Sequence, residues 1–301
     1  MPDSRAILVA QCADRTGLVA TITQWFHNHH GNLLELDQHV DRSTDQFFIR
    51  IEWDLDHFII PSGQIHDAFA REIGEPLGLN WRIRLPGNRP RMAILVSQMG
   101  HCLWDLLTRS QSGELDVDIP LVISNHDTFA DTARQFGCDF HQLVVTRDNK
   151  ADQEAQQLAL LAEHAIDFVV LARYMQILSS SFASAYSERI INIHHSFLPA
   201  FAGAKPYHRA HERGVKIIGA TAHYVTEDLD EGPIIDQDTV RVSHRDPVRD
   251  LIRKGRDNEK IVLSRAVRLH LEERIAVHDN RTIIFSWWRL PTPPPSLVVR
   301  H

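Results

Sequence analysis

Between residues 92 and 193, short apolar runs alternate with segments whose apolar residues recur at helical spacing. Strands that alternate with helices are joined by crossover connections, so they form a parallel, doubly wound sheet. Ligands of such sheets bind beyond the carboxyl ends of the strands. The predicted strands span 92–96, 117–123, 143–145, 168–171 and 190–193. We therefore predict an α/β domain with a site along one edge of its sheet, completed by a helix over 247–273 and a strand over 281–285.

The first 84 residues follow a different order: strand, helix, strand, strand, helix, strand. This βαββαβ order is the ferredoxin-like plan. Its predicted strands span 6–10, 33–40, 47–53 and 81–84, and its helices 19–30 and 62–73. A stretch rich in Pro and Gly follows and ends regular structure. We expect a domain over 1–84, a linker over 85–91, a main domain over 92–286 and an extended, Pro-rich tail over 287–301.

Charge and cysteine content restrict which partners the protein can bind and in which cellular compartment it is expected. Residues 1–84 carry seven Arg and no Lys against twelve Asp and Glu. This negative field repels phosphate backbones, so we expect no nucleic-acid partner. No apolar run approaches the roughly 18 residues that a membrane span needs, and the N-terminus lacks the pattern of a signal peptide. The three widely spread cysteines are typical of reduced thiols. We expect a cytoplasmic protein with no membrane partner.

The 19 histidines raise the question of a metal. No His-x-x-x-His or Cys-x-x-Cys pair occurs. His29 and His30 are adjacent, as are His194 and His195, so the side chains of each pair point apart. We expect no metal site.

Two groups of polar residues lie where apolar runs end. Asn192 and His194 alternate on one face of the strand that begins at Ile190, and Thr221 and His223 alternate on one face of a second strand over 219–225. Asp230 follows in a turn. An amide, an imidazole and a carboxylate supply the oxyanion donor, the proton carrier and the base of acyl-group chemistry. Taken singly, Asn192 and Asp230 are equally typical of ordinary turns.

The combination carries a family resemblance. The motifs are Asn192-Ile193-His194, Ser196-Phe197-Leu198-Pro199, Thr221-Ala222-His223 and Leu229-Asp230-Glu231-Gly232-Pro233. Together they resemble the folate-dependent formyltransferase family, and within it the formyltetrahydrofolate deformylases, over nearly the whole chain. The resemblance implies a Rossmann-like, mostly parallel formyltransferase-type domain. It also implies hydrolysis of 10-formyltetrahydrofolate to formate and tetrahydrofolate, which balances the one-carbon folate pool and supplies formate for purine synthesis.

The same resemblance implies roles for single residues. Asp230 would deprotonate the attacking water, and His194 and Asn192 would stabilise the oxyanion. Thr221 and His223 would position Asp230 and its water. Met175, Gln176, Ile177 and Leu178 would line the pterin pocket, although from their residue types Met175, Ile177 and Leu178 could equally be core. No cofactor is implied, because the folate is the substrate.

The segment Ser97-Gln98-Met99-Gly100-His101-Cys102 bears on the choice between hydrolysis and transfer. In the glycinamide-ribonucleotide transformylases of this family, a Gly-Ser-Asn loop at this place holds the phosphate of the acceptor. The segment here has one glycine and two bulky side chains, so it exposes less backbone N–H for a phosphate. Water is then the expected nucleophile. The alternatives are a formyltransferase with an amine acceptor and a non-catalytic folate sensor.

The N-terminal domain resembles the ACT family of small regulatory modules. The resemblance lies in the βαββαβ order and in Asp14-Arg15-Thr16-Gly17-Leu18 at the first strand–helix turn. ACT modules often bind amino acids where two copies pair. The resemblance thus implies an amino-acid effector and a homo-oligomer, although Gly17 could serve the chain reversal alone.

Overall fold

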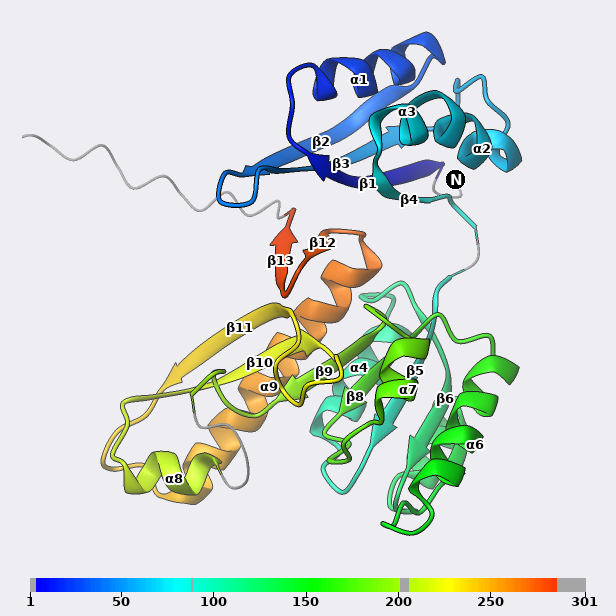
Figure 1. Cartoon of the computed structure of the whole chain (residues 1–301). Coiled ribbons are helices and arrows are strands. Elements are labelled where there is room, and N and C mark those ends of the chain that lie inside the picture. Colours follow the sequence, from blue (N-terminus) through cyan, green and yellow to red (C-terminus); the bar gives the residue numbers. More distant parts are fainter. Residues whose placement is uncertain (1–3, 88, 201–205, 286–301) are drawn as a thin grey trace, which may run out of the picture. The chain divides into compact units, whose positions relative to one another are not determined.

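The computed structural model describes residues 4–87, 89–200 and 206–285 (Figure 1). The chain divides into two compact units, one formed by Met1–Pro86 with Ile283–His301 and the other by Gly87–Thr282. The predicted tail over 287–301 lies outside the described residues. No helix in the described part of the chain is long and apolar enough to cross a membrane.

The N-terminal unit is an antiparallel sheet in the order β2-β3-β1-β4. Its strands are β1 (Arg5–Ala13), β2 (Asn32–Asp41), β3 (Gln46–Asp54) and β4 (Asn80–Arg84). Helix α1 (Leu18–Asn28) buries Trp25 and Phe26 in a core shared with Trp53 and Phe69. Connections and strand order are those of the predicted ferredoxin-like fold, and the sheet fits an ACT domain.

The second helical segment of this unit is not the single helix predicted over 62–73. It consists of a 3₁₀ turn (Ser62–Gln64), α2 (Ile65–Phe69), a π turn (Ala70–Gly74) and α3 (Glu75–Leu77). Pro76 has no N–H for the carbonyl four residues earlier, and a π turn accommodates such a break in the helical ladder. Gly78 ends the segment in the left-handed conformation (φ 63°).

The second unit contains a seven-stranded sheet in the order β11-β10-β9-β8-β5-β6-β7. Five of its strands are parallel: β5 (Arg91–Val96), β6 (Asp118–Ser124), β7 (Asp139–Gln142), β8 (Phe168–Ala172) and β9 (Ile190–His194). The two strands at one edge form antiparallel pairs: β10 (Ile217–Tyr224) is antiparallel to β9, and β11 (Ile234–Arg241) is antiparallel to β10. The prediction of a mostly parallel, Rossmann-like sheet is confirmed; β11 was not among the predicted strands.

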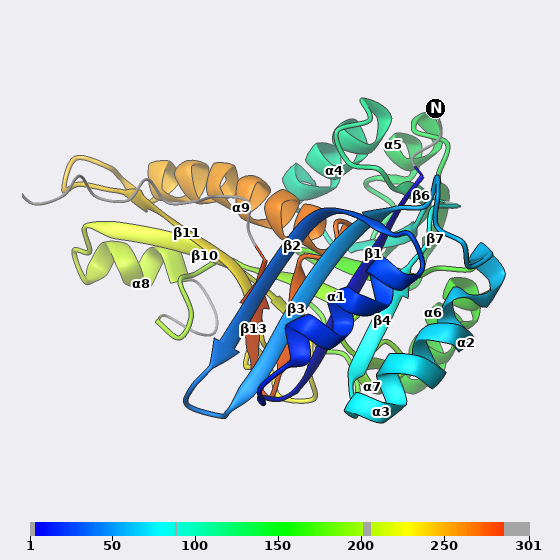
Figure 2. The same ribbon diagram turned by 90° about the horizontal axis from the view of Figure 1, so that it is seen from above.

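Helices cover both faces of this sheet (Figure 2). Helices α4, α5 and α9 lie on one side, and α6 and α7 on the other. Residues Leu161 of α6 and Phe182 of α7 pack with Leu95 and Leu121 of the sheet. The bounds are α4 (His101–Gln111), α5 (Ala130–Gln135), α6 (Lys150–Glu163), α7 (Ser180–Ala185), α8 (Pro206–Glu212) and α9 (Val248–Leu271). A two-stranded sheet, β12 (Ile275–His278) with β13 (Arg281–Ile284), follows α9.

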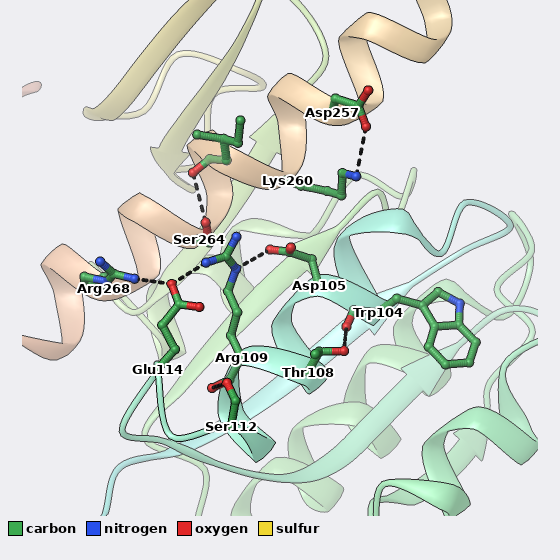
Figure 3. Close-up of polar contacts among 11 residues, drawn as sticks. Trp104, Asp105, Thr108, Arg109, Ser112, Glu114, Asp257, Lys260, Ser264 and Arg268 are labelled. Atoms are coloured by element: carbon green, nitrogen blue, oxygen red, sulfur yellow. Dashed lines mark hydrogen bonds and ion pairs between the residues drawn. The ribbon is translucent and has the colours of Figure 1, made fainter.

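Ion pairs join α4 to α9 along their outer sides (Figure 3). Arg109 pairs with Asp105 at 2.8 Å and also with Glu114, which in turn pairs with Arg268 of α9. Such partly exposed pairs contribute little stability singly. The packing of α4 and α9 on the same face of the sheet is what brings their ends together.

The predicted strand over 143–145 is wrong. The strand in this part of the sheet is β7, and it ends at Gln142 opposite Ser124, the last residue of β6. The Leu143 N–H still donates to the Ser124 carbonyl at 2.8 Å, but the register with β6 ends at this point, so the run does not continue as a paired strand. Val144 is accordingly half exposed, and the apolar run over 143–145 continues into a loop.

Candidate active site

The pairing of β9 with β10 assembles the first part of the site. In the antiparallel register, Asn192 lies opposite His223 and His194 lies opposite Thr221. Residues two apart on a strand share a face, and directly opposed residues share the same face of the sheet. Four of the predicted site residues therefore lie in one square patch on one face of the sheet.

Asp230 reaches this patch from the loop between β10 and β11. Its backbone is left-handed (φ 59°), a conformation that Asp tolerates better than most side chains. Gly232 follows, where an added Cβ would lie 1.8 Å from the carbonyl oxygen of Tyr224. Only glycine allows this close return of the loop against β10. The Asp-x-Gly sequence thus directs the carboxylate back toward the strand face.

The carboxylate of Asp230 meets His194. Its Oδ1 lies 3.1 Å from His194 Nδ1 and 3.8 Å from His223 Nε2. Burial opposes ionisation of Asp230, but the hydrogen bond from His194 and the neighbouring imidazoles outweigh it and lower the pKa of the carboxyl group. Asp230 is therefore held as a carboxylate, an acceptor of protons, at neutral pH.

His223 is held as a neutral ring with a defined tautomer. Its Nδ1 lies 2.9 Å from the Tyr224 carbonyl oxygen, which can only accept, so Nδ1 carries the proton. Its Nε2, at 3.1 Å, then accepts a hydrogen bond from the Asn192 amide. Burial lowers the pKa of His223 below its usual value. His223 therefore orients the Asn192 amide group, which keeps its second N–H for another acceptor.

His194 keeps one nitrogen unused. The ring is buried, its Nδ1 faces Asp230, and its Nε2 has no hydrogen-bond partner. A buried polar atom without a partner is costly and is common where a ligand or a reacting group binds. When the ring carries both protons, its Nε2–H and the free Asn192 N–H are two donors available to one substrate atom.

Thr221 has a different place from the one expected. Its hydroxyl donates to the Ser196 carbonyl at 2.9 Å and accepts from the Leu198 N–H at 3.0 Å. Gln237 of β11 donates to the same hydroxyl at 2.9 Å. The hydrogen bonds of Thr221 therefore hold the 196–198 turn after β9, whereas His223 is the residue that contacts Asn192 and lies near Asp230.

The segment predicted to contact the substrate leaves the carboxyl end of β8, the neighbour of β9. Met175 and Ile177 are 63% and 58% exposed, so neither is a core residue. Leu178 is partly buried and packs against the core beneath, and Gln176 is partly exposed. Two exposed apolar side chains at a strand end of this kind of sheet are typical of a ligand-binding loop.

A second polar cluster, which no sequence motif predicts, lies where the ends of α4, α8 and β8 meet the middle of α9. The carboxylate of Glu259, fully buried on α9, accepts from His101 at 2.7 Å and from Tyr207 at 2.6 Å. Arg173 lies 3.5 Å away. No motif in the sequence marks Glu259. The one sequence signal is His101, through its place in the 97–102 segment.

This cluster also contains the one group of metal-type donors within the described ranges. Ligand atoms of His101, Cys102 and Glu259 lie within 4.8 Å of one another. Both Glu259 oxygens already accept hydrogen bonds, and the Arg173 cation faces them. Burial raises the pKa of the Cys102 thiol well above its usual value, which opposes the thiolate that a metal requires. The group has the chemistry of a buried ion pair rather than of a cation site.

The patch formed by Asn192, His194, His223 and Asp230 can therefore activate a nucleophile and stabilise an oxyanion. Asp230 supplies a proton acceptor, and the two donors beside it can bind an oxygen that gains charge. Such an arrangement serves addition of a nucleophile to a carbonyl carbon.

Comparisons with known proteins agree with this chemistry. The family model described as Formyl transferase matches residues 90–267. A formyltetrahydrofolate deformylase from Synechocystis sp. is 54% identical over 286 residues, which cover 95% of this chain and 100% of that protein. The crystal structure of a formyltetrahydrofolate deformylase from Pseudomonas syringae pv. tomato has a TM-score of 0.91 at 45% identity and covers 94% of this chain and 95% of its own. A glycinamide ribonucleotide transformylase from Symbiobacterium toebii has a TM-score of 0.62 at 33% identity and covers 67% of this chain and 97% of its own.

Proposed function

The chain belongs to the formyltetrahydrofolate deformylase family, and we propose that Asn192, His194 and Asp230 carry the family's reaction in it. The protein is an enzyme that hydrolyses 10-formyltetrahydrofolate to formate and tetrahydrofolate. The observation that carries our assignment of residues is the contact of Asp230 with His194 at 3.1 Å, next to the unused His194 Nε2.

The reaction begins with water beside Asp230. The carboxylate accepts a proton from water as the water oxygen bonds to the formyl carbon. The carbonyl oxygen becomes an oxyanion, which accepts hydrogen bonds from the free Asn192 N–H and from Nε2 of His194 in its doubly protonated form. Asp230 then passes its proton to N10 of the folate, the C–N bond breaks, and formic acid leaves as formate and a proton.

The folate binds along the β8 end of the sheet. We assign Met175 and Ile177 to contact with the pterin ring, because their side chains are apolar and exposed beside the catalytic strand. Gln176 and Leu178 complete this contact through their backbone groups. The reaction needs no cofactor and no metal, since water and the carboxylate supply the nucleophile and the base.

The assignment is tested by formate release from 10-formyltetrahydrofolate with no amine acceptor present. We expect stoichiometric formate and tetrahydrofolate from the wild-type chain. Substrate binding without formate release would mean that the protein is a non-catalytic folate sensor.

Transfer to an amine acceptor is the second candidate, because a transformylase matches two thirds of the chain at 33% identity. The 97–102 segment argues against it. Its His101 side chain is already bound to Glu259 at 2.7 Å, and a Cβ at Gly100 would lie 2.4 Å from the Phe129 ring, so the segment is closely packed. Transfer requires an anchored acceptor, since positioning is worth roughly 7–11 kcal/mol of barrier. Formylated glycinamide ribonucleotide that forms at the expense of formate would establish transfer instead.

For the N-terminal unit we propose regulation and self-association, by an amino-acid effector and through pairing of two copies. Its antiparallel sheet in the ACT order supports this role. Calorimetric titration of the full chain with each amino acid tests for an effector, and sedimentation tests for pairing of two copies. No heat of binding would exclude an amino-acid effector, and a monomer under all conditions would exclude self-association. We further propose that the enzyme works in the cytoplasm and supplies formate for purine synthesis.

A further inference from the structure

The loop over 173–179, which joins β8 to α7, is held in an unfavourable backbone conformation. Arg173 (φ 63°) and Met175 (φ 62°) are both left-handed, although neither is glycine. Side chains with a Cβ rarely adopt this conformation, so it persists only where the surroundings impose it. Something must hold this loop while Met175 and Ile177 remain exposed.

One support comes from Tyr174, which lies between the two left-handed residues. Its side chain is buried, and its hydroxyl accepts a hydrogen bond from Gln157 Nε2 at 2.8 Å. Gln157 is fully buried on α6. Burial raises the pKa of Tyr174 to about 12, so the phenol stays neutral. The side chain of Tyr174 therefore fixes the first half of the loop to α6.

A second support from α6 is Glu154, one helical turn before Gln157 on the same face of the helix. Its Oε1 accepts from the Ser179 backbone N–H at 3.0 Å, and Lys150 lies 3.7 Å from the same oxygen. Glu154 is itself buried. Both ends of the loop are thus fixed to two neighbouring polar side chains of one helix. The ion pair of Arg173 with Glu259 of α9 adds to these two contacts.

We infer that Gln157 and Glu154 are positioning residues for the folate-binding loop: they contact no substrate, but they hold Tyr174 and Ser179 so that Met175 and Ile177 face the pterin ring. This inference rests on the proposed assignment of the loop. A loosened loop lowers the fraction of enzyme that is competent to bind, and the apparent affinity falls by that fraction. The catalytic residues lie on β9 and in the 225–233 loop, so the effect falls on KM and not on kcat.

The test compares Gln157→Leu with Gln156→Leu, the same change at the exposed neighbouring position of α6. Loss of one buried hydrogen bond should raise KM about five- to tenfold. The kcat value should stay within about twofold of wild type. Gln156→Leu should match wild type in both, and amide hydrogen exchange over 173–179 should be faster only in Gln157→Leu. Tyr174→Phe, which removes the other partner of the same hydrogen bond, should raise KM to a similar degree. The double variant with Tyr174→Phe and Gln157→Leu should have the same KM as either single variant.

Glu154 supplies an independent arm that does not depend on the folding of Gln157→Leu. Glu154→Ala should raise KM, and Glu154→Gln should restore it, because the amide oxygen can still accept from Ser179. Equal KM values for Gln157→Leu and Gln156→Leu, or a fall in kcat at constant KM, would overturn the inference. A wild-type chain that releases no formate would instead refute the proposed function, so the two failures are distinguishable.

Discussion

Two histidine–carboxylate pairs in the same unit have opposite characters. His194 and Asp230 lie 3.1 Å apart, and His101 and Glu259 lie 2.7 Å apart. In both pairs burial opposes ionisation, and hydrogen bonds from neighbouring groups outweigh it and lower the pKa of the carboxyl group. The two pairs differ in solvent exposure and in the hydrogen-bonding atoms that have no partner. The Asp230 side chain is 18% exposed and its partner keeps a free Nε2, whereas Glu259 is fully buried with both oxygens occupied.

The difference shows that residue type and pairing alone do not identify a catalytic carboxylate. A carboxylate whose hydrogen bonds are all made inside the protein cannot bind a substrate, and its removal lowers the free energy of unfolding. A carboxylate that borders an unused donor and solvent can exchange a proton with a bound molecule. The two pairs should therefore differ in whether their loss lowers turnover or lowers stability.

The largest effect is expected at Asp230. Asp230→Asn keeps the shape but removes the proton acceptor, and we expect kcat to fall by about 10⁴-fold, the upper range for loss of a general base. Folate binding should be retained. The neighbouring exposed change Asp228→Asn is the control and should leave kcat unaltered. Hydrolysis near the wild-type rate in Asp230→Asn would remove this residue from the mechanism.

At Glu259 we expect a loss of stability instead of a loss of turnover. Glu259→Gln leaves Arg173 buried without its counter-charge and should lower the free energy of unfolding by about 3–5 kcal/mol, measured by urea denaturation. On the same helix, Asp257→Asn breaks the partly exposed pair with Lys260 (Figure 3) and should cost at most about 1 kcal/mol. Equal stabilities of these two variants would contradict the structural role of Glu259.

Asn192→Ala sharpens the catalytic side of the comparison. Loss of one oxyanion donor should lower kcat by about 10²–10³-fold. The free energy of unfolding should change little by comparison, since the amide is partly exposed. A fall in kcat of less than about threefold would mean that the donor is not used.

The smallest effect concerns acidification. His195, which feels the charges of both Asp230 and Glu259, has its pKa lowered to about 4 by burial and by the Arg173 charge. Its unfolded pKa is near 6.5. Between these values the unfolded chain binds the extra proton, so His195 contributes stability above about pH 6.5 that is lost progressively toward pH 4.

The measurement is the free energy of unfolding of wild type and of His195→Gln between pH 7 and pH 4. The variant should lose stability less steeply, by up to about 1.4 kcal/mol per pH unit. Parallel curves would show that His195 does not bind its proton differently in the two states.

Much of the fold followed from local pattern. Apolar alternation with period two and helical spacing located most strands and helices of both units, because each depends on neighbours a few residues away. The pattern also placed Asn192 with His194, and Thr221 with His223, on common strand faces. It failed at 143–145, where the length of the neighbouring strand β6, and not the apolar run itself, sets the end of the pairing.

Tertiary structure alone decided which polar groups meet. His101 and Glu259 are 158 positions apart in sequence, and Gln157 lies 17 positions from Tyr174 across a helix-to-sheet packing contact. Nothing in the local sequence distinguishes Glu259 from a surface residue of a charged helix, and nothing directs Thr221 to the turn after β9 instead of to Asp230. The hydrogen-bond partner of a side chain is set by the packing of whole helices and strands. Local sequence therefore determined most elements and the residue types at the site. The packing determined that Asp230, and not Glu259, is the carboxylate that can react with a bound molecule.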